Sequence, residues 1–337
     1  MSGNMLSKDL ILPIAAALTL WKVPLQAGHH LMADKPSAGA PVQPGVKGVM
    51  FLLPAYLIWG FCPIFWKLLA HVSSFELVMH RTWWSLAFLV IILLFQKRSR
   101  EVIDIFRHPR YLMVLLITTL ILAFNWYLFI WAVNHDQVLQ TSLGYYINPL
   151  ITVFLGMVFL KERLRVYQTL ALILAGIGVV YYAVGLGTFP WIALAIAGSF
   201  AIYGLLHKVM AVKPLPGLLT ETLLLSFPAL GYIAWLMAHG EGALFNIGWQ
   251  TDLLLAGTCL VTGLPLLFFT IGTKHSTLAT VGFMQYIAPC CSFILAVFYY
   301  REPFSYQKLV TFIFIWTALT IYTADSFIHY RKNSLNR

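Results

Sequence analysis

Charged residues are scarce in this sequence. Asp, Glu, Lys and Arg together make up 10% of its 337 residues, whereas apolar residues make up 60%. Soluble domains contain about 25% charged and about 45–50% apolar residues. A soluble chain of this length could not bury so much apolar surface in one core, but a lipid bilayer solvates it. The composition therefore excludes a soluble protein and predicts an integral membrane protein.

Cysteine is also rare, and the motifs of several binding chemistries are missing. The four cysteines lie in apolar stretches without CxxC or Cys/His metal spacing, namely Cys62, Cys259, Cys290 and Cys291. We expect them to pack as small apolar side chains. No Arg-rich stripe or Gly-rich phosphate loop accompanies the net charge of +10. We therefore expect no metal, no cofactor and no nucleic-acid partner.

Ten stretches are long and apolar enough to cross a membrane. A spanning helix needs about 20 mostly apolar residues, because each residue rises about 1.5 Å and the hydrocarbon core is about 30 Å thick. The connectors are too short to hold a soluble domain. The predicted spans are 48–69, 75–95, 111–133, 139–160, 166–187, 190–207, 218–238, 252–273, 278–299 and 309–328.

Basic residues are distributed unevenly among the connectors. The second, fourth, sixth and eighth connectors together hold eleven Lys and Arg residues, whereas the first, third, fifth and seventh hold none. Basic loops stay in the cytoplasm, so we expect both termini, including the basic tail 329–337, to be cytoplasmic. The ninth connector departs from this rule, because its Arg301 and Lys308 would lie on the outer side.

The first 47 residues form an extension for which three interpretations stay open. A secretory signal peptide cleaved near Ala27 is one, and an interfacial segment is another. The third is that Met32 is the true start, so that residues 1–31 are not native and 32–47 form a short polar cytoplasmic tail. We favour the third, because cleavage near Ala27 would leave the mature N-terminus outside, against the charge bias of the loops.

The sequence contains a weak internal repeat. The stretch Tyr146 to Pro149 near the end of the fourth span recurs as Tyr286 to Pro289 near the end of the ninth. Thirteen residues after each proline comes a glutamate preceded by a basic residue, which is Glu162 in one case and Glu302 in the other. We expect these two glutamates to cap helices or to form ion pairs in turns. Glu76 in the second span is matched by Glu221 in the seventh, at a similar offset.

The offset divides the chain into two halves of five spans, 48–187 and 188–328. Because five is an odd number, the second half enters the membrane from the opposite side. This inversion accounts for the basic ninth connector, since it corresponds to the basic fourth connector of the first half. The predicted fold is thus all-α, with ten transmembrane helices arranged as two inverted five-helix repeats, a common architecture of secondary transporters.

Several stretches make the chain resemble a known family. They are Ala55 to Gly60, His80-Arg81, Asn125 to Asn134, Ser142 to Leu150 and Gly282 to Pro289. The sequence is similar there to the RarD group of the EamA family, in the drug/metabolite transporter superfamily. The resemblance implies ten helices, two EamA repeats, an inner-membrane location and solute transport without ATP hydrolysis. The long N-terminus and Lys161, where the family would have Gly, depart from that pattern.

Ionisable side chains inside a bilayer cost about 2.5–3.5 kcal/mol each on insertion scales, so each is a candidate functional residue. Arg81, about five residues into the second span, is predicted to hold an anionic group of a solute; an ion pair with Glu76 or snorkelling is the alternative. His80 is a candidate proton relay or a helix-packing residue. Glu76 and Glu221 are candidates for proton coupling, while a pair with Lys208 or Lys213 is the alternative for Glu221.

Neutral polar and aromatic residues complete the predicted solute site. Tyr145, Asn148 and Pro149 share one helical face, and the ninth span repeats this arrangement. Proline-interrupted helices at matching places of two halves indicate a midplane binding site, with packing kinks as the alternative. The predicted binding residues besides His80 and Arg81 are Trp59, Asn125, Trp126, Tyr145, Asn148, Tyr203, Gln285 and Tyr286, and the predicted gating prolines are Pro149, Pro265 and Pro289.

These observations predict a secondary transporter that exports a small metabolite or an amphipathic drug-like solute by alternating access. Its expected partners are that solute and the lipid bilayer, with proton coupling left open and no oligomeric state indicated. A channel or scaffold is the alternative. An enzyme is disfavoured, because the only local constellation, Asn134-His135-Asp136, lacks metal spacing and a nearby nucleophile.

Overall fold

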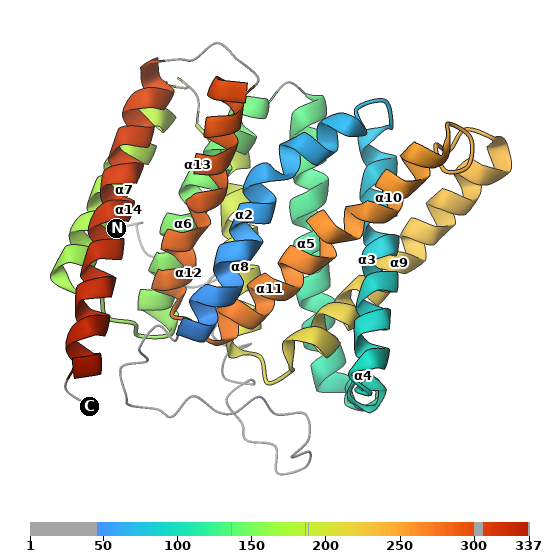
Figure 1. Ribbon diagram of the computed structural model, residues 1–337, viewed down its shortest axis with the longest axis horizontal. Helices are drawn as coiled ribbons and strands as arrows, with labels where there is room; N and C mark the ends of the chain where they lie inside the picture. Colours follow the sequence, from blue (N-terminus) through green and yellow to red (C-terminus); the bar gives the residue numbers. More distant parts are fainter. Residues whose placement is uncertain (1–45, 136, 186, 188, 300–305, 336–337) are drawn as a thin grey trace, which may run out of the picture.

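The computed structural model describes residues 46–335, apart from 136, 186, 188 and 300–305, and these residues form helices joined by short turns (Figure 1). The first half contains α2 (Val46–Leu68), α3 (Ser74–Phe95), α4 (Ser99–Arg107), α5 (Pro109–Asn134), α6 (Val138–Phe159) and α7 (Val166–Gly185). The second contains α8 (Trp191–Val209), α9 (Pro214–His239), α10 (Trp249–Val261), α11 (Gly263–Lys274), α12 (Leu278–Gln285), α13 (Ile287–Ile294), the π-helix η1 (Leu295–Tyr299) and α14 (Tyr306–Leu335).

The predicted all-α membrane fold is confirmed. Within the described residues, nine helical stretches are long and apolar enough to cross a membrane, with α10 and α11 counted as one span. The shorter apolar stretch Leu278–Ile294, formed by α12 and α13, supplies the tenth. The interpretations of the N-terminal extension up to residue 45, and those of Arg301 and Glu302, lie outside the described residues.

Local chemistry sets where several helices begin and end. The Ser73 hydroxyl accepts the backbone N–H of Glu76 at 3.3 Å and caps the start of α3. Helices α5 and α9 each begin with a proline, Pro109 and Pro214, whose missing N–H is not needed in the first turn. Helix α9 ends at Gly240, whose φ of 68° is a left-handed conformation that glycine adopts without strain.

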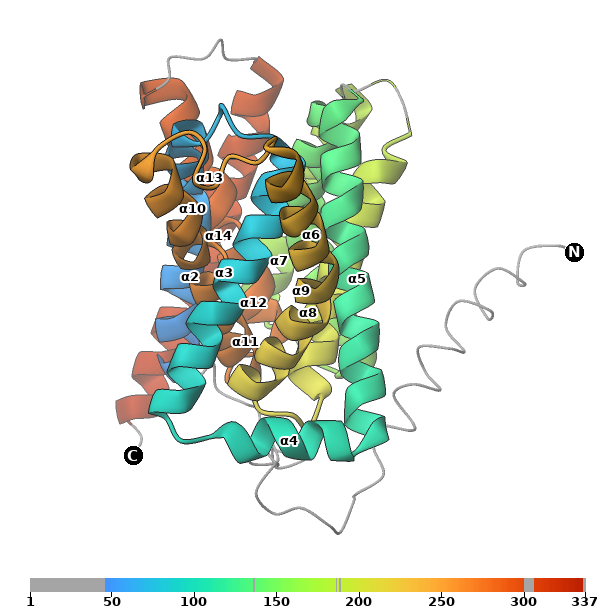
Figure 2. The same ribbon diagram turned by 90° about the vertical axis from the view of Figure 1, so that its right-hand side faces the viewer.

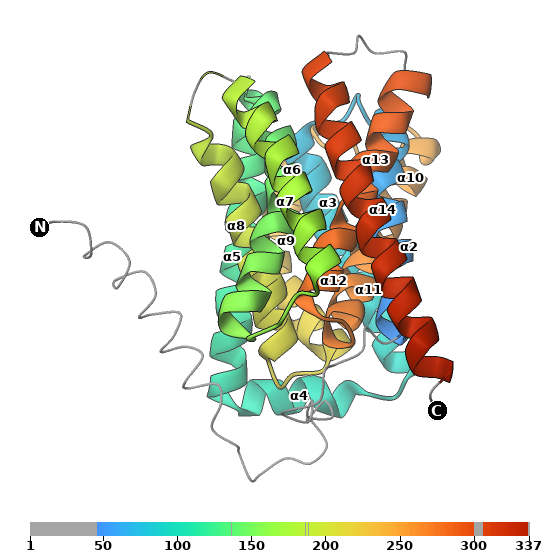
Figure 3. The same ribbon diagram turned by 90° about the vertical axis from the view of Figure 1, so that its left-hand side faces the viewer.

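The two halves pack as an inverted repeat requires. The second, fourth and fifth spans each pack on their counterpart in the other half, in the pairs α3–α9, α6–α12 and α7–α14. The first span packs on the eighth, as α2–α11, and the third packs on the sixth, as α5–α8. These two contacts are equivalent, because the first span corresponds to the sixth and the third to the eighth. Figures 1 and 3 show α7 and α14 side by side at one flank of the bundle.

Glycines let the halves approach closely. A Cβ atom at Gly282 of α12 would lie 2.7 Å from the backbone oxygen of Pro149 in α6. A Cβ atom at Gly272 of α11 would lie 2.6 Å from Cγ of Leu52 in α2. Both distances are too short for nonbonded carbon and oxygen atoms, so these positions require glycine for backbone-level packing between spans.

The proline-marked spans differ from one another. The eighth span is interrupted at Thr262, with Pro265 in the first turn of α11, and the ninth is interrupted at Tyr286, just before Pro289 in α13. Helix α6, in contrast, runs through Pro149 without interruption. Pro149 therefore does not break its helix, because a membrane helix tolerates the loss of one backbone hydrogen bond when neighbouring groups supply partners. A gating role of the three prolines stays a prediction.

The second connector, expected to be a charged loop, contains the short helix α4. Figure 2 shows α4 lying crosswise beneath the ends of α3 and α5. Ile105 anchors this helix with no exposed surface. Glu101 of α4 forms ion pairs with Arg98 at 2.7 Å and with Lys213 at 3.0 Å. The end of the bundle where α4 lies is called the α4 end below.

Candidate functional site

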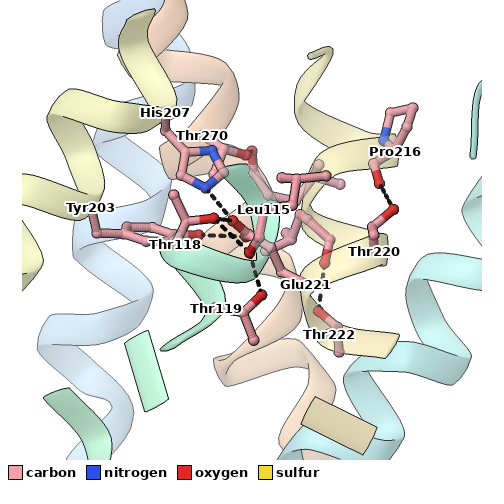
Figure 4. Close-up of polar contacts among 12 residues, drawn as sticks. Leu115, Thr118, Thr119, Tyr203, His207, Pro216, Thr220, Glu221, Thr222 and Thr270 are labelled. Atoms are coloured by element: carbon pink, nitrogen blue, oxygen red, sulfur yellow. Dashed lines mark hydrogen bonds and ion pairs between the residues drawn. The ribbon is translucent and has the colours of Figure 1, made fainter. Parts of the chain in front are cut away.

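A buried carboxylate lies between three helices toward the α4 end (Figure 4). Glu221 of α9 is 1% exposed. Nε2 of His207 lies 2.9 Å from its Oε1, and the Tyr203 hydroxyl donates to its Oε2 at 3.1 Å. The hydroxyl of Thr118 on α5 also donates to Oε1. These four residues, Thr118, Tyr203, His207 and Glu221, are called the Glu221 cluster.

The helical periods of two elements build this cluster. Tyr203 and His207 are four residues apart on α8, so they project from the same face, with ring centroids 4.3 Å apart. Glu221 is the eighth residue of α9, which places it about 10 Å into the helix at about 1.5 Å per residue. It was expected only three or four residues inside, because the span was predicted to begin at 218.

The expected alternative partners of Glu221 have other contacts. Lys213 pairs with Glu101. Lys208 donates to the carbonyl oxygen of Thr273 at 3.3 Å and to that of Ser276. The alternative of a pair with either lysine is therefore wrong. In the described part of the chain, no lysine or arginine forms an ion pair with Glu221. Its ionisable partner is His207.

At the α4 end, two lysines on different helices each donate to carbonyl groups at the C-terminal end of the other's helix. Lys208, near the C-terminus of α8, donates to carbonyl groups at the C-terminus of α11. Lys274, the last residue of α11, donates to the carbonyl of Met210, which follows α8. Each ammonium group thus lies where the helix dipole of the other helix is negative and its last carbonyls lack partners. We call this reciprocal contact the lysine latch.

A cavity of about 10 Å³, with room for about one water molecule, adjoins the Glu221 cluster. Besides Glu221, its polar lining consists of Thr82, Ser85, Thr222 and Thr262. The Ser85 hydroxyl is buried and has no hydrogen-bond partner among the described residues. Trp126 forms part of the same wall. A single water there would give the Ser85 hydroxyl a hydrogen-bond partner.

Arg81 lies against Trp126, which also borders that cavity. Its guanidinium carbon is 4.0 Å from the centroid of the Trp126 ring, a cation–π contact. Nε of Arg81 is buried and without a hydrogen-bond partner in the described structure. The side chains of Cys62 and Tyr145 are near enough to interact with its charge. The two predicted binding residues Arg81 and Trp126 are thus brought together.

Glu76 does not pair with Arg81, so that alternative for the arginine is wrong. The Glu76 carboxylate accepts the backbone N–H of Ala243 at 2.6 Å, which ties α3 to the loop after α9. Nε2 of His80 lies 3.6 Å from the same Oε1 atom. His80 is buried at 1% exposure. Glu76 and His80 therefore form a second Glu–His pair, at the end of the bundle opposite the Glu221 cluster.

Two of the predicted binding residues, Trp59 and Tyr203, lie in one aromatic cluster. The Trp59 ring of α2 lies 6.2 Å from Phe200 of α8 and 5.9 Å from Phe269 of α11, measured between centroids. Tyr203 stacks on Phe200 at 5.9 Å and is fully buried. This aromatic cluster fills the centre between the first, sixth and eighth spans and leads directly to Glu221 through the Tyr203 hydroxyl.

Four predicted binding residues instead join helices to one another. Asn125 donates to the carbonyl of Ile196 and Asn148 to that of Ala197, both at 2.8 Å. The hydroxyl of Thr152 donates to Gln285, and that of Tyr286 donates to the carbonyl of Tyr146. All four are at least nine-tenths buried, Asn125 between α5 and α8 and the other three where α6 packs on α8 and on the ninth span. Their geometry matches the packing alternative; Tyr145, 53% exposed, is not buried with them.

Sequence reasoning missed His207 and Thr118. His207 was the last residue of the predicted sixth span, and an ionisable residue at that depth is itself a signal. Because His207 is four residues after Tyr203, both were expected on one face of the same helix, but the sequence does not indicate which face of that helix meets α9. Among the described residues, no group of three or more His, Cys, Asp or Glu is placed to hold a metal ion, and the four cysteines are free.

This fold is that of a multi-pass membrane protein, and comparison with known proteins places it in a class of membrane transporters. Residues 46–184 match the EamA-like transporter family. Protein RarD of Escherichia coli is 40% identical over 288 residues, covering 86% of this chain and 97% of that protein. The chain therefore belongs to the EamA family and to its RarD group.

Two further relatives are similar over most of their length. An uncharacterized transporter of Vibrio cholerae is 43% identical over 283 residues, which cover 84% of this chain and 94% of that protein. A protein of Pseudomonas aeruginosa named chloramphenicol-sensitive protein RarD is 29% identical over 293 residues, which cover 86% of this chain and 97% of that protein. A solved crystal structure, 20% identical, superposes with a TM-score of 0.64 over 83% of this chain and 98% of that chain, which shows the common fold.

Proposed function

We propose that this protein is a secondary transporter of the bacterial inner membrane that exports a small amphipathic solute by alternating access, without ATP hydrolysis. The observation that carries this proposal is the Arg81–Trp126 pair in a chain of the EamA family. In this proposal both termini and the α4 end are cytoplasmic, because the second connector, which contains α4, is rich in Lys and Arg.

Arg81 gives the solute site its chemistry. A guanidinium that lies over an aromatic ring can still donate from N–H groups in its own plane, and Nε of Arg81 has no partner among the described residues. A carboxylate, a phosphate or another strong acceptor on the solute could take these donors, and the Trp126 ring could contact an apolar part of it. The proposed solute is therefore amphipathic, with an acceptor group at one end.

The inverted repeat supports alternating access. The lysine latch joins the ends of α8 and α11, and in this proposal it keeps the α4 end closed. Lys67 ends the first span as Lys208 ends the sixth, 141 positions further on. In the proposed cycle the latch opens at one face while the corresponding ends of α2 and α5, around Lys67, close at the other.

A flux assay tests this function. The purified full-length protein in liposomes is offered a panel of labelled amphipathic anions and neutral drugs, chloramphenicol included. We expect saturable flux of at least one solute. Arg81→Ala should weaken its apparent affinity by about tenfold or more, because charge-assisted hydrogen bonds contribute about 1.5–3 kcal/mol.

A control arginine separates recognition from folding. Arg107 is 73% exposed on α4, and Arg107→Ala should transport like the unaltered protein. Equal affinities for the Arg81→Ala protein and the unaltered protein would refute the role of Arg81. Flux that never saturates would favour a channel.

A further inference from the structure

We propose that the Glu221 cluster is a proton-binding site that couples solute movement to the proton gradient. This inference rests on the proposed transport function, but it concerns residues other than those that contact the solute. Glu221 and His207 are each 1% exposed, and their polar atoms face one another and the hydroxyls of Tyr203 and Thr118 (Figure 4).

The charge of this cluster depends on one proton. Glutamate beside a neutral imidazole leaves a net charge of −1, which is expensive to bury inside a bilayer. One additional proton, held on His207 or on Glu221, makes the cluster neutral. No lysine or arginine among the described residues pairs with Glu221 to remove this need. Burying the cluster away from water is therefore less costly with this proton bound than without it.

The ionisable groups on the helices around Glu221 do not take over this role. Helices α3, α4, α5 and α11 pack on α9. On α4, Glu101 pairs with Arg98 and Lys213, and on α11, Lys274 is in the lysine latch. On α3, Arg81 contacts Trp126, while Glu76 and His80 lie at the far end of α9. Helix α5 presents the Thr118 hydroxyl, and α8 contributes Tyr203 and His207.

The structure also links the cluster to the proposed solute site. Glu221, Thr82, Ser85 and Thr262 line the same water-sized cavity. Its wall includes Trp126, whose ring contacts Arg81, the proposed solute-binding residue. The proton site and the solute site thus share one side chain. A change in charge at Glu221 acts on the position of Trp126 and Arg81, which is the coupling that a proton-driven transporter requires.

The opening of the lysine latch controls hydration of the cluster. His207 immediately precedes Lys208 on α8, so separation of the ends of α8 and α11 moves His207 relative to Glu221. Water then reaches the carboxylate and takes up the proton. The same rearrangement that opens the α4 end therefore releases the proton there, in keeping with alternating access.

A solute-free experiment tests the proton site by itself. Proteoliposomes adsorbed on a sensor receive a rapid pH jump between about pH 8 and about pH 5, the range in which His changes charge. Proton binding to a buried site produces a transient current. We expect this current in the unaltered protein and in Glu241→Gln, a matched control on an exposed glutamate. It should be absent in Glu221→Gln and present with a shifted pH midpoint in Glu221→Asp.

The outcomes separate this proposal from the transport proposal. If the unaltered protein gives no transient, or if Glu221→Gln keeps it, the proton site is refuted, even when solute flux is normal. If the transient behaves as expected but no solute of the panel moves, the transport proposal fails and the proton site stands. Tyr203→Phe, which keeps the ring and removes one donor, should keep the current and shift its midpoint to higher pH; an unchanged midpoint would contradict the contact's role.

Discussion

The carboxylate of Glu162 accepts the backbone N–H of Leu278 at 2.8 Å, across a sequence separation of 116 residues. Its second oxygen accepts the N–H of Ala279 at 3.0 Å. Glu162 lies in the connector between α6 and α7, whereas Leu278 begins α12, so the contact joins the two halves. A carboxylate at a helix N-terminus satisfies free N–H groups and faces the positive end of the dipole. The expected capping role is confirmed for Glu162.

We expect Glu162→Ala to lower the free energy of unfolding by about 1 kcal/mol, the usual cost of losing a helix N-cap. Thermal unfolding of the purified protein in detergent measures this effect. The melting temperature of Glu162→Gln should fall between those of the unaltered protein and Glu162→Ala. Glu241→Ala, at an exposed glutamate, serves as the control. An unchanged melting temperature for Glu162→Ala would show that the contact contributes nothing to stability.

Replacement of Gly282 tests the close packing of α6 and α12. A Cβ atom there would meet the backbone oxygen of Pro149 at 2.7 Å, so Gly282→Ala should destabilise the protein by about 1–3 kcal/mol through overpacking. At Gly198 on α8, a Cβ atom meets nothing within 4 Å, so Gly198→Ala should leave stability unchanged or raise it slightly. Melting temperatures of the two variants check the prediction, which an equal effect at both positions would contradict.

The lysine latch is expected to hold the ends of α8 and α11 together. Lys274→Met keeps the length of the side chain but removes its donor, so the carbonyl of Met210 loses its partner. Amide hydrogen exchange should become faster at the residues just after α8 and α11, and remain unchanged in the middle of α5. Lys208→Met should act on the same segments. Exchange rates that match those of the unaltered protein would rule out a latch.

Acid should loosen α4. Partial burial raises the pKa of Glu101, but hydrogen bonds and charges from Arg98 and Lys213 outweigh it and hold the pKa below its usual value of 4.5. A folded-state pKa below the unfolded value means that the contact stabilises α4 above the unfolded pKa and stops doing so as the pH falls through the folded pKa. Hydrogen exchange in α4, corrected for its intrinsic pH dependence, should therefore accelerate below about pH 4.5.

A glutamine variant identifies the group responsible. Glu101→Gln cannot titrate, so its corrected exchange in α4 should be faster at neutral pH and independent of pH in the acid range. If the unaltered protein and Glu101→Gln show the same acid response, another group loosens α4 and the ion pairs with Arg98 and Lys213 are not its cause.

The sequence predicted the fold better than the site, and particular residues show why. Spans follow from counts of apolar residues, which are local, so their positions agree within a few residues. The helix α4 was missed because the spans were sought as long apolar stretches, and this short helix is amphipathic, with Val102, Ile105 and Phe106 at helical spacing among charged residues. Glu221 was placed too near the surface because Pro214 was taken as part of the connector, whereas proline is favourable in the first turn of a helix.

The direction of side chains around each helix explains the remaining differences. Asn148 and Gln285 are residue types that often line binding sites. Here they form hydrogen bonds between helices where α6 packs against α8 and α12. His207 and Glu221 meet only because α8 and α9 present particular faces to each other. Such pairings depend on three-dimensional packing, which the pattern of a single sequence does not contain.

Counterflow in proteoliposomes tests the central claim most directly. Vesicles preloaded with an unlabelled solute from the flux panel are diluted into a trace of the same solute in labelled form, without any pH gradient or membrane potential. An alternating-access transporter exchanges the two, so the label should accumulate transiently above its equilibrium level, with Arg107→Ala behaving like the unaltered protein and Arg81→Ala showing little accumulation at the same concentration. Label that only equilibrates, whether or not the vesicles are preloaded, would contradict alternating access in this protein.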